Sequence, residues 1–342
     1  QLQSPVTIDI ETEMGNPSRI VLLTAFDGQV LYRVLPKDIT RFVEDHFTTC
    51  VLRCHNSPFD LGHSAAYAGQ VGLLLNMVRE NRIQDTLALS KLVSLAEGTY
   101  WGNKLGEVSE KYLGASLPKD VKHEKKLVSH SYGNYDDIRK APAAFLHYNA
   151  FDVIATHNLW DPLHNRAREL AAEHRVDPDK LLSYGLLVST GICGTITSHN
   201  GFALDQEGVN AKASELEAEI ERTKAILANY GYVPGKDGVQ DVYCSILAKI
   251  EQEHGVTFNQ YFHQGRKKSI YSEKEEDLRS FLHIEFISTF LAYEKASKLY
   301  STFVQPLIGK DRAHTTYNSG MVTGRISSSG PDLQNVPGVG GF

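Results

Sequence analysis

The sequence lacks several features that define whole classes of protein. Its 342 residues contain no apolar run near the roughly 18 residues of a membrane-spanning helix, and no basic segment that leads into an apolar one as in a secretory signal. Glycine and proline, at 27 and 12 residues, are too few for a collagen-like or low-complexity chain. With 42% hydrophobic and 22% charged residues, the composition excludes a mostly disordered chain and predicts two or three folded domains at this length.

Cysteine and excess positive charge are also scarce. Cys50, Cys54 and His55 have part of the spacing of a zinc site, but no second ligand pair follows at the spacing of a zinc finger. We therefore expect all four cysteines to be buried free thiols in a reducing compartment. The net charge of −6 argues against a protein that coats nucleic acid through bulk positive charge, but it is compatible with an enzyme whose acids hold metal ions.

The first half of the sequence predicts an α/β fold, in which a mixed sheet carries flanking helices. Strands are predicted at residues 5–11, 20–26, 29–34 and 51–55, the second and third joined by the hairpin dipeptide Asp27-Gly28. Helices are predicted at residues 41–47, 60–68, 85–95, 104–112 and 141–159.

Beyond Asn200-Gly201 the predicted structure is mainly helical. Apolar stripes and glycine breaks indicate helices at residues 206–229, 239–254 and 285–307, and Ser272 with Glu275 and Glu276 indicates a capped helix start. A basic loop covers residues 263–268. From about residue 311, small polar residues, glycine and proline predominate, which indicates a different kind of structure.

Paired acids provide the first chemical signal. Asp9 and Glu11 are two residues apart in a predicted strand, so both lie on one of its faces. Val6, Ile8 and Ile10 occupy the other face. A solvated strand face would explain the acids alone, but this strand is predicted to be central, where unpaired acids are costly. A bound metal ion would offset that cost.

Two further elements carry acids. Asp60 closes the segment Asn56-Ser57-Pro58-Phe59-Asp60 after a predicted strand, and its simplest interpretation is a helix N-cap. Tyr148 and Asp152 are four residues apart and share one helical face, and the simplest interpretation there is an amphipathic helix with Asp152 facing water. The histidines near these elements are interpreted as helix or strand residues rather than metal ligands: His55, His63 and His147.

Taken in this order, Asp9-x-Glu11, Asn56 to Asp60 and Tyr148 to Asp152 resemble the three motifs of the DEDD-type 3′→5′ exonucleases, in the variety with a tyrosine in the third motif. Gln84-Asp85-Thr86-Leu87 and Leu105–Leu113 resemble the sequence between those motifs. The resemblance implies a ribonuclease H-like fold and hydrolysis with two metal ions. Asp9, Glu11 and Asp152 would hold one Mg²⁺, and Asp9 with Asp60 the second, with Mn²⁺ as an alternative metal. Tyr148 would orient the attacking water.

A second resemblance covers the end of the sequence. Residues 323–337, TGRISSSGPDLQNVP, closely resemble the opening palm segment of family A DNA polymerases, and His314-Thr315-Thr316-Tyr317 resembles the stretch before it. Residues 200–310 resemble the thumb. The implied organisation is an exonuclease domain at 1–165, connecting helices at 166–200, a thumb at 201–310 and the start of the palm at 311–342. The remaining palm and the fingers of that family lie outside these residues.

The polymerase resemblance also implies contacts with DNA. Arg325 would reach the minor groove at the primer end. Lys267 and Lys268 would grip the duplex backbone, although a solvated loop explains them almost as well. The other expected contacts to backbone or template are Thr323, Ser327, Ser328, Gln334, Asn335 and His314.

The sequence therefore predicts part of a family A DNA polymerase of DNA replication. This part would remove nucleotides from a single-stranded 3′ DNA end and grip the primer–template duplex, in the cytoplasm of a bacterial or phage-infected cell and without membrane association. Two interpretations stay open: a DNA-holding module with an inactive exonuclease fold, and a stand-alone RNA 3′→5′ exonuclease. The complete acid set argues against the first, and residues 323–337 argue against the second.

Overall fold

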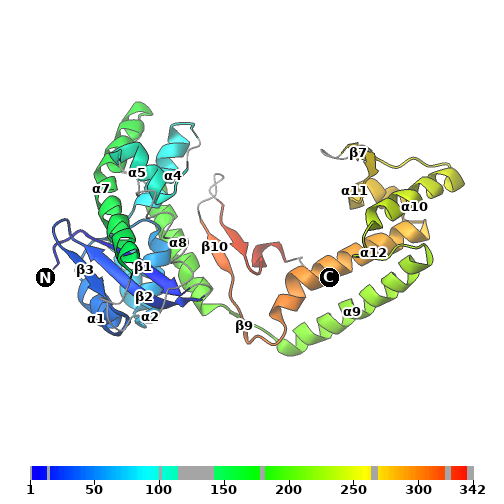
Figure 1. The fold of residues 1–342 in the computed structure, drawn as a ribbon, viewed down its shortest axis with the longest axis horizontal. Coiled ribbons are helices and arrows are strands. Elements are labelled where there is room, and N and C mark those ends of the chain that lie inside the picture. The colour runs from blue at the N-terminus through cyan, green and yellow to red at the C-terminus, as the bar shows by residue number, and fades with distance from the viewer. Residues whose placement is uncertain are drawn as a thin grey trace. The chain divides into compact units, whose positions relative to one another are not determined.

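The computed structural model forms two compact units (Figure 1). Unit 1 comprises Gln1–Gly201 with His314–Ser329, and unit 2 comprises Phe202–Ala313 with Gly330–Phe342. The residues that the structure describes are 2–13, 16–99, 102–114, 142–177, 182–262, 269–319 and 325–336. Among them, no helix is both long and apolar enough to cross a membrane.

Unit 1 is built on a mixed five-stranded sheet, as the sequence predicts. Its strands are β1 (Val6–Glu13), β2 (Asn16–Phe26), β3 (Leu31–Val34), β4 (Leu52–Cys54) and β5 (Ile83–Asp85), and their order is β3-β2-β1-β4-β5. The central strand β1 pairs antiparallel with β2 and parallel with β4, and β4 pairs parallel with β5. β5 was not predicted, because three residues are too few to show an alternating pattern.

Helices pack around this sheet and on one another. They are α1 (Pro36–His46), α2 (Ser57–Tyr67), α3 (Val71–Arg79), α4 (Thr86–Ala96), α5 (Leu105–Leu113), α7 (Ala143–Glu173) and α8 (Leu182–Asn200). α7 is much longer than the predicted 141–159 and continues through Pro162. A proline inside a helix costs about 3 kcal/mol. That cost is offset here because Leu159 and Leu163 on either side of it are fully buried against α4 and α5.

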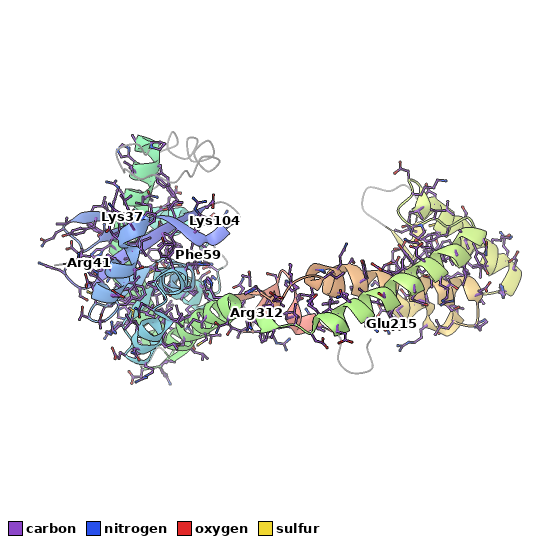
Figure 2. The ribbon with its side chains drawn as sticks, turned by 90° about the horizontal axis from the view of Figure 1, so that it is seen from below. Lys37, Arg41, Phe59, Lys104, Glu215 and Arg312 are labelled. Carbon is purple, nitrogen blue, oxygen red and sulfur yellow. The ribbon has the colours of Figure 1, made fainter. Side chains whose placement is uncertain are left out.

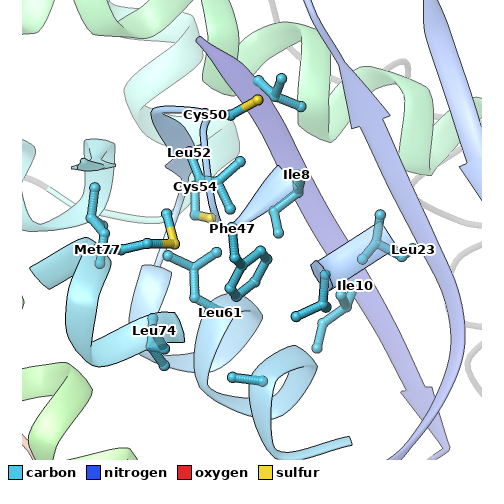
Figure 3. Close-up of a cluster of buried hydrophobic side chains, with 14 of the residues drawn as sticks. Ile8, Ile10, Leu23, Phe47, Cys50, Leu52, Cys54, Leu61, Leu74 and Met77 are labelled. Atoms are coloured by element: carbon cyan, nitrogen blue, oxygen red, sulfur yellow. The ribbon is translucent and has the colours of Figure 1, made fainter. Parts of the chain in front are cut away.

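The core of unit 1 lies between the sheet and α2 (Figure 3). Ile8 and Ile10 of β1 are at most 4% exposed and pack in one cluster with Phe47 and Leu61, which confirms the predicted apolar face of β1. Cys54 belongs to the same cluster. All four cysteines are free, as predicted, but only Cys50 and Cys54 are buried, whereas Cys193 is exposed and Cys244 is half-buried.

Unit 2 is mainly helical, with α9 (Gln206–Asn229), α10 (Val239–His254), α11 (Glu275–Leu278) and α12 (Glu285–Leu299). α9 packs along α12 through Leu216, Ile220 and Leu299. The opposite side of α9 is solvated and carries Glu215, labelled in Figure 2. Short strand pairs complete the unit: β6 (Phe202–Ala203) with β9 (Arg312–Ala313), and β7 (Gln260–Phe262) with β8 (Ser269–Tyr271).

Two predictions in unit 2 were wrong in detail. The predicted helix 285–307 is α-helical only to Leu299, after which the backbone forms a π-helical turn at Tyr300–Val304 and a 3₁₀ turn at Gln305–Leu307. Ser272 does not cap α11. Lys274 is its N-cap residue, and the Ser272 hydroxyl instead donates to the Asp277 carboxylate over 2.6 Å.

A hairpin of β10 (Thr316–Asn318) and β11 (Ser327–Ser329) packs on α8 within unit 1. The approach is close because glycines face the neighbouring elements. A Cβ atom added at Gly191 would lie 2.6 Å from Cγ of Pro58 on α2, and one added at Gly194 would lie 2.9 Å from Cβ of Tyr317 on β10. At these two glycines, side chains of α2 and of the hairpin therefore lie directly against the backbone of α8.

We expect Gly191→Ala to destabilise unit 1 by about 1–3 kcal/mol, because its methyl group would overlap the Pro58 ring. Gly185→Ala on the same helix is the matched control: a Cβ there meets nothing within 4 Å. It should gain up to about 1 kcal/mol from helix propensity. The measurement is urea unfolding followed by tryptophan fluorescence, since Trp160 belongs to unit 1. Equal stability of the two variants would contradict the close packing.

Candidate metal centre

Three carboxylates from two elements meet above the centre of the sheet. Asp9 and Glu11 point from β1 away from the apolar core, and Asp152 comes from α7. One oxygen of each lies within 4.8 Å of the others. Asp152 is only 6% exposed, so the interpretation that it faces water is wrong. Three oxygen donors this close together fit a hard divalent cation such as Mg²⁺.

Asp60 lies beside this cluster, in the first turn of α2. It is 3% exposed, and its Oδ1 accepts a hydrogen bond from the Ile10 amide over 3.2 Å, which ties α2 to β1. Its interpretation as an N-cap is wrong, because Asn56 occupies that position with φ of 99°. Burial raises the pKa of Asp60 well above its ordinary value, and the charges of Asp85, Glu11 and Asp152 add to the rise, while the Ile10 hydrogen bond opposes it.

Tyr148 precedes Asp152 by one turn of α7 and faces the same acids. Burial raises the pKa of its phenol far above 10.0, and the charges of Asp152 and Glu11 and a hydrogen bond to Asp152 raise it further. The phenol is therefore neutral at any physiological pH. A neutral hydroxyl can both donate and accept, which suits it to orient a water molecule next to carboxylates.

Sequence reasoning missed Asn149 as a residue of this site. Its side chain is fully buried, and its Nδ2 donates a hydrogen bond of 2.7 Å to Oε1 of Glu11. One signal was available: Asn149 lies three residues before Asp152, so a helix places both on the same face. The contact itself joins residues 138 apart and depends on how α7 packs on the sheet.

A buried carboxylate positions the start of α2. Oδ2 of Asp85, at the end of β5, accepts hydrogen bonds from the Ser57 amide over 2.7 Å and from the Ser57 hydroxyl over 2.6 Å. Its Oδ1 accepts from the Ala88 amide over 3.0 Å as the N-cap of α4. One side chain thus joins the beginnings of α2 and α4 at the edge where the parallel strands β4 and β5 end.

A second set of contacts fixes α7 over β1. Nδ1 of His157 lies 3.0 Å from the Thr7 hydroxyl, and Nη1 of Arg53 donates to the His157 carbonyl over 2.6 Å. The Arg53 guanidinium also lies over the Trp160 ring, 5.4 Å from its centroid. Burial lowers the pKa of Arg53 to about 10, so it remains charged. These contacts hold α7 against β1 and β4, and so help to place Asp152 next to Asp9 and Glu11.

The residues expected to contact DNA are only partly described. Arg325 is exposed just before β11, whereas Ser328 is buried and pairs with Tyr317 in the hairpin. The His314 ring lies 2.8 Å from the Ser198 carbonyl. Gln334 and Asn335 are exposed in a 3₁₀ turn, and Ser327 is half-buried. Three expected contacts lie outside the described residues: Thr323, Lys267 and Lys268.

The fold and the site define a mixed α/β unit with a cluster of acids that could hold a cation, joined to a helical unit. Residues 246–340 match the family model of DNA polymerase family A. DNA polymerase I of Helicobacter pylori (strain ATCC 700392 / 26695) is 41% identical over 56 residues, which are 15% of this chain and 6% of that protein. The thermostable DNA polymerase I of Thermus filiformis is 32% identical over 143 residues, 40% of this chain and 17% of that protein.

A solved structure extends the likeness to nearly the whole chain. The polymerase domain of Pol1 from M. smegmatis, in complex with DNA primer-template and dNTP, superposes with a TM-score of 0.62 at 16% identity. The alignment covers 97% of this chain and 52% of that one. The chain thus spans about half the length of this solved structure and less than a fifth of the curated relatives. These matches relate the chain to family A DNA polymerases through its C-terminal part, and its fold to the Pol1 fold.

We expect Asp60→Asn to raise the free energy of unfolding of the metal-free protein at neutral pH. Because the folded pKa lies above the ordinary 3.8, the folded state binds this proton more tightly than the unfolded chain does, and stability is lost as the pH rises towards the folded pKa. Asparagine stays neutral and keeps an acceptor for the Ile10 amide. Urea unfolding with EDTA should show a larger gain near pH 8 than near pH 5. The same gain at both pH values would contradict the raised pKa.

Proposed function

We propose that this chain carries a metal-dependent 3′→5′ exonuclease that removes nucleotides from a DNA end. The observation that carries the proposal is the cluster of Asp9, Glu11 and Asp152, whose oxygens lie within 4.8 Å of one another, with Asp60 and Tyr148 beside it. Two divalent ions, Mg²⁺ or in its place Mn²⁺, would supply an activated water and stabilise the charge that develops on the leaving oxygen.

The side chains divide this work among them. Asp9, Glu11 and Asp152 would hold one ion, and Asp9 with Asp60 the second. The neutral Tyr148 hydroxyl would orient the attacking water, because it can accept from water while donating to Asp152. Asp60 and Asp152 are buried, and in this poorly solvated position their attraction for a bound cation would be stronger than in water.

The polymer favoured as substrate is DNA, within a family A DNA polymerase that acts in replication. Support comes from the family match of residues 246–340 and from the fold of Pol1, which is solved with primer-template DNA. The same match argues against a stand-alone RNA exonuclease. The acid cluster argues against an inactive DNA-holding module, since that role has no need of closely spaced carboxylates.

We also propose the domain roles that the sequence implies: a ribonuclease H-like exonuclease at 1–165, connecting helices at 166–200, a thumb at 201–310 and the start of a palm at 311–342. The compact units do not follow these limits, since α8 and the β10–β11 hairpin both pack within unit 1. The predicted DNA contacts of residues 314–335 and of Lys267 and Lys268 remain part of this proposal, as does a cytoplasmic location in a bacterial or phage-infected cell.

The purified chain should digest single-stranded DNA from its 3′ end when Mg²⁺ or Mn²⁺ is added. Replacing Asp9 and Glu11 together by alanine should abolish digestion without lowering the unfolding free energy, because the loss of like-charge repulsion should offset the loss of the Asn149 hydrogen bond. Digestion of 5′-labelled strands followed on gels measures the activity. Glu13→Ala is the matched control, because Glu13 lies on the same strand but pairs with Arg19 over 3.0 Å. Full activity of the double variant would refute the site assignment.

Tyr148→Phe should slow digestion by about 100-fold, the effect typical of losing one hydrogen-bonding group of acid–base catalysis. The affinity for Mn²⁺, measured by calorimetry, should stay unchanged, because phenylalanine keeps the ring and removes no metal ligand. A variant that binds Mn²⁺ more weakly, but digests DNA at the wild-type rate when Mn²⁺ is saturating, would show that the water-orienting role of Tyr148 is wrong.

Arg325→Ala should weaken binding to a primer–template duplex by about 1–3 kcal/mol, the range for one charged hydrogen bond. The logarithm of the association constant for DNA falls linearly with the logarithm of the salt concentration. The steepness of this dependence should decrease by about 1 if Arg325 contacts a phosphate, and by less if it contacts a base. Arg41→Ala removes the same charge from an exposed helix, where Arg41 pairs with Asp45, and serves as control. Equal effects of both variants would mean that Arg325 contributes only net charge.

A further inference from the structure

Asn149 is polar, fully buried and only half satisfied. Its Nδ2 donates to Oε1 of Glu11 over 2.7 Å, whereas its Oδ1, also buried, has no hydrogen-bond partner in the described part of the chain. A buried carbonyl oxygen without a partner is destabilising, and such groups are rare in folded proteins. An apolar side chain of similar shape would pack here without that penalty. The folding of α7 therefore gives no reason for an amide at this position.

The amide has a clear effect on Glu11. That carboxylate is half-buried on β1, and a carboxylate can rotate so that either oxygen faces a cation. A donor fixed at Oε1 opposes this rotation and holds the carboxylate in one orientation next to Asp9 and Asp152. The donor is also neutral. A lysine or arginine in its place would neutralise Glu11 and compete with the cation, whereas an amide orients the carboxylate and leaves its charge available.

The position of the amide is itself fixed. Two turns further along α7, His157 is held by Thr7 of β1, 3.0 Å away, and by Arg53 of β4, which donates to its carbonyl over 2.6 Å. Asn149 and Glu11 thus belong to two elements that are joined by hydrogen bonds outside the acid cluster. The packing of α7 on β1 thus keeps the donor next to Glu11 without help from a bound cation.

We propose that Asn149 is a positioning residue that orients Glu11 for the cation in the exonuclease site. The inference rests on the proposed function above for its catalytic consequence, but its effect on cation binding can be measured without any DNA.

The test is Asn149→Leu, which keeps the shape of the side chain and removes both the donor and the carbonyl without a partner. Calorimetric titration of the DNA-free protein with Mn²⁺ should show affinity lower by about 10-fold or more, the effect typical of losing a partner of a metal ligand. The Mg²⁺ concentration that half-activates digestion should rise by a similar factor. KM for single-stranded DNA at saturating Mg²⁺ should be unchanged, and the urea unfolding midpoint should be equal or higher.

Ser109→Ala is the matched control. Ser109 lies on α5, is fully buried, and its hydroxyl has no hydrogen-bond partner among the described residues, but α5 carries none of the site acids. This variant should leave Mn²⁺ affinity unchanged. Asn149→Ala is a second variant that also removes the donor, for use if leucine prevents folding.

Each outcome has a defined meaning. Wild-type Mn²⁺ affinity in folded Asn149→Leu or Asn149→Ala overturns the inference, and so does a uniform loss of activity with an unchanged Mg²⁺ midpoint. Weaker Mn²⁺ binding in these variants but not in Ser109→Ala supports it. If the wild-type protein binds Mn²⁺ but cleaves no DNA, the proposed function fails, while the binding titrations still decide the role of Asn149.

Discussion

Mutual repulsion among carboxylates is the constraint on which the rest of unit 1 depends. Asp9, Glu11 and Asp152 converge within 4.8 Å, and Asp60 is buried next to them. Such an arrangement opposes folding unless the elements that carry the acids are held by other means. The structure supplies these means through an apolar core under β1, the Asp85 hydrogen bonds at the start of α2, and the Thr7, Arg53 and His157 contacts under α7. The apolar core thus lies on one face of β1, and the acids lie on the other face together with the Thr7–His157 contact.

The sequence revealed the acids better than their surroundings, because the acids follow a local pattern and most of their supporting contacts do not. The two-residue spacing of Asp9 and Glu11 against Ile8 and Ile10 is a local pattern, and the strand it predicts is present. α9 and α10 were predicted at their observed limits because an apolar stripe and flanking glycines define them locally. Asn149 was missed because its role depends on a contact with β1, which no local pattern encodes.

Other differences have equally specific causes. The end of α7 was placed too early because Pro162 is a strong local stop signal, and only tertiary burial of Leu159 and Leu163 overcomes it. The change from α12 to a π-helical turn at Tyr300 has no marker in the sequence, since it depends on which carbonyl each amide reaches. Asp60 was open to interpretation as an N-cap because a polar residue after a strand commonly has that role. The preceding Asn56, with its positive φ, takes it instead.

The strand pair β6–β9 joins two segments that the whole helical unit separates in the sequence. Phe202 pairs with Ala313, so the segment that contains α9 to α12 begins and ends at adjacent strands. A segment with adjacent ends can lengthen or shorten during evolution without stretching the body from which it departs. The same arrangement acts during synthesis on the ribosome. The face of α8 that carries Gly194 receives Tyr317 only after more than 100 intervening residues have been made, so the unit that bears the acids acquires its last strands after the helical unit has been translated.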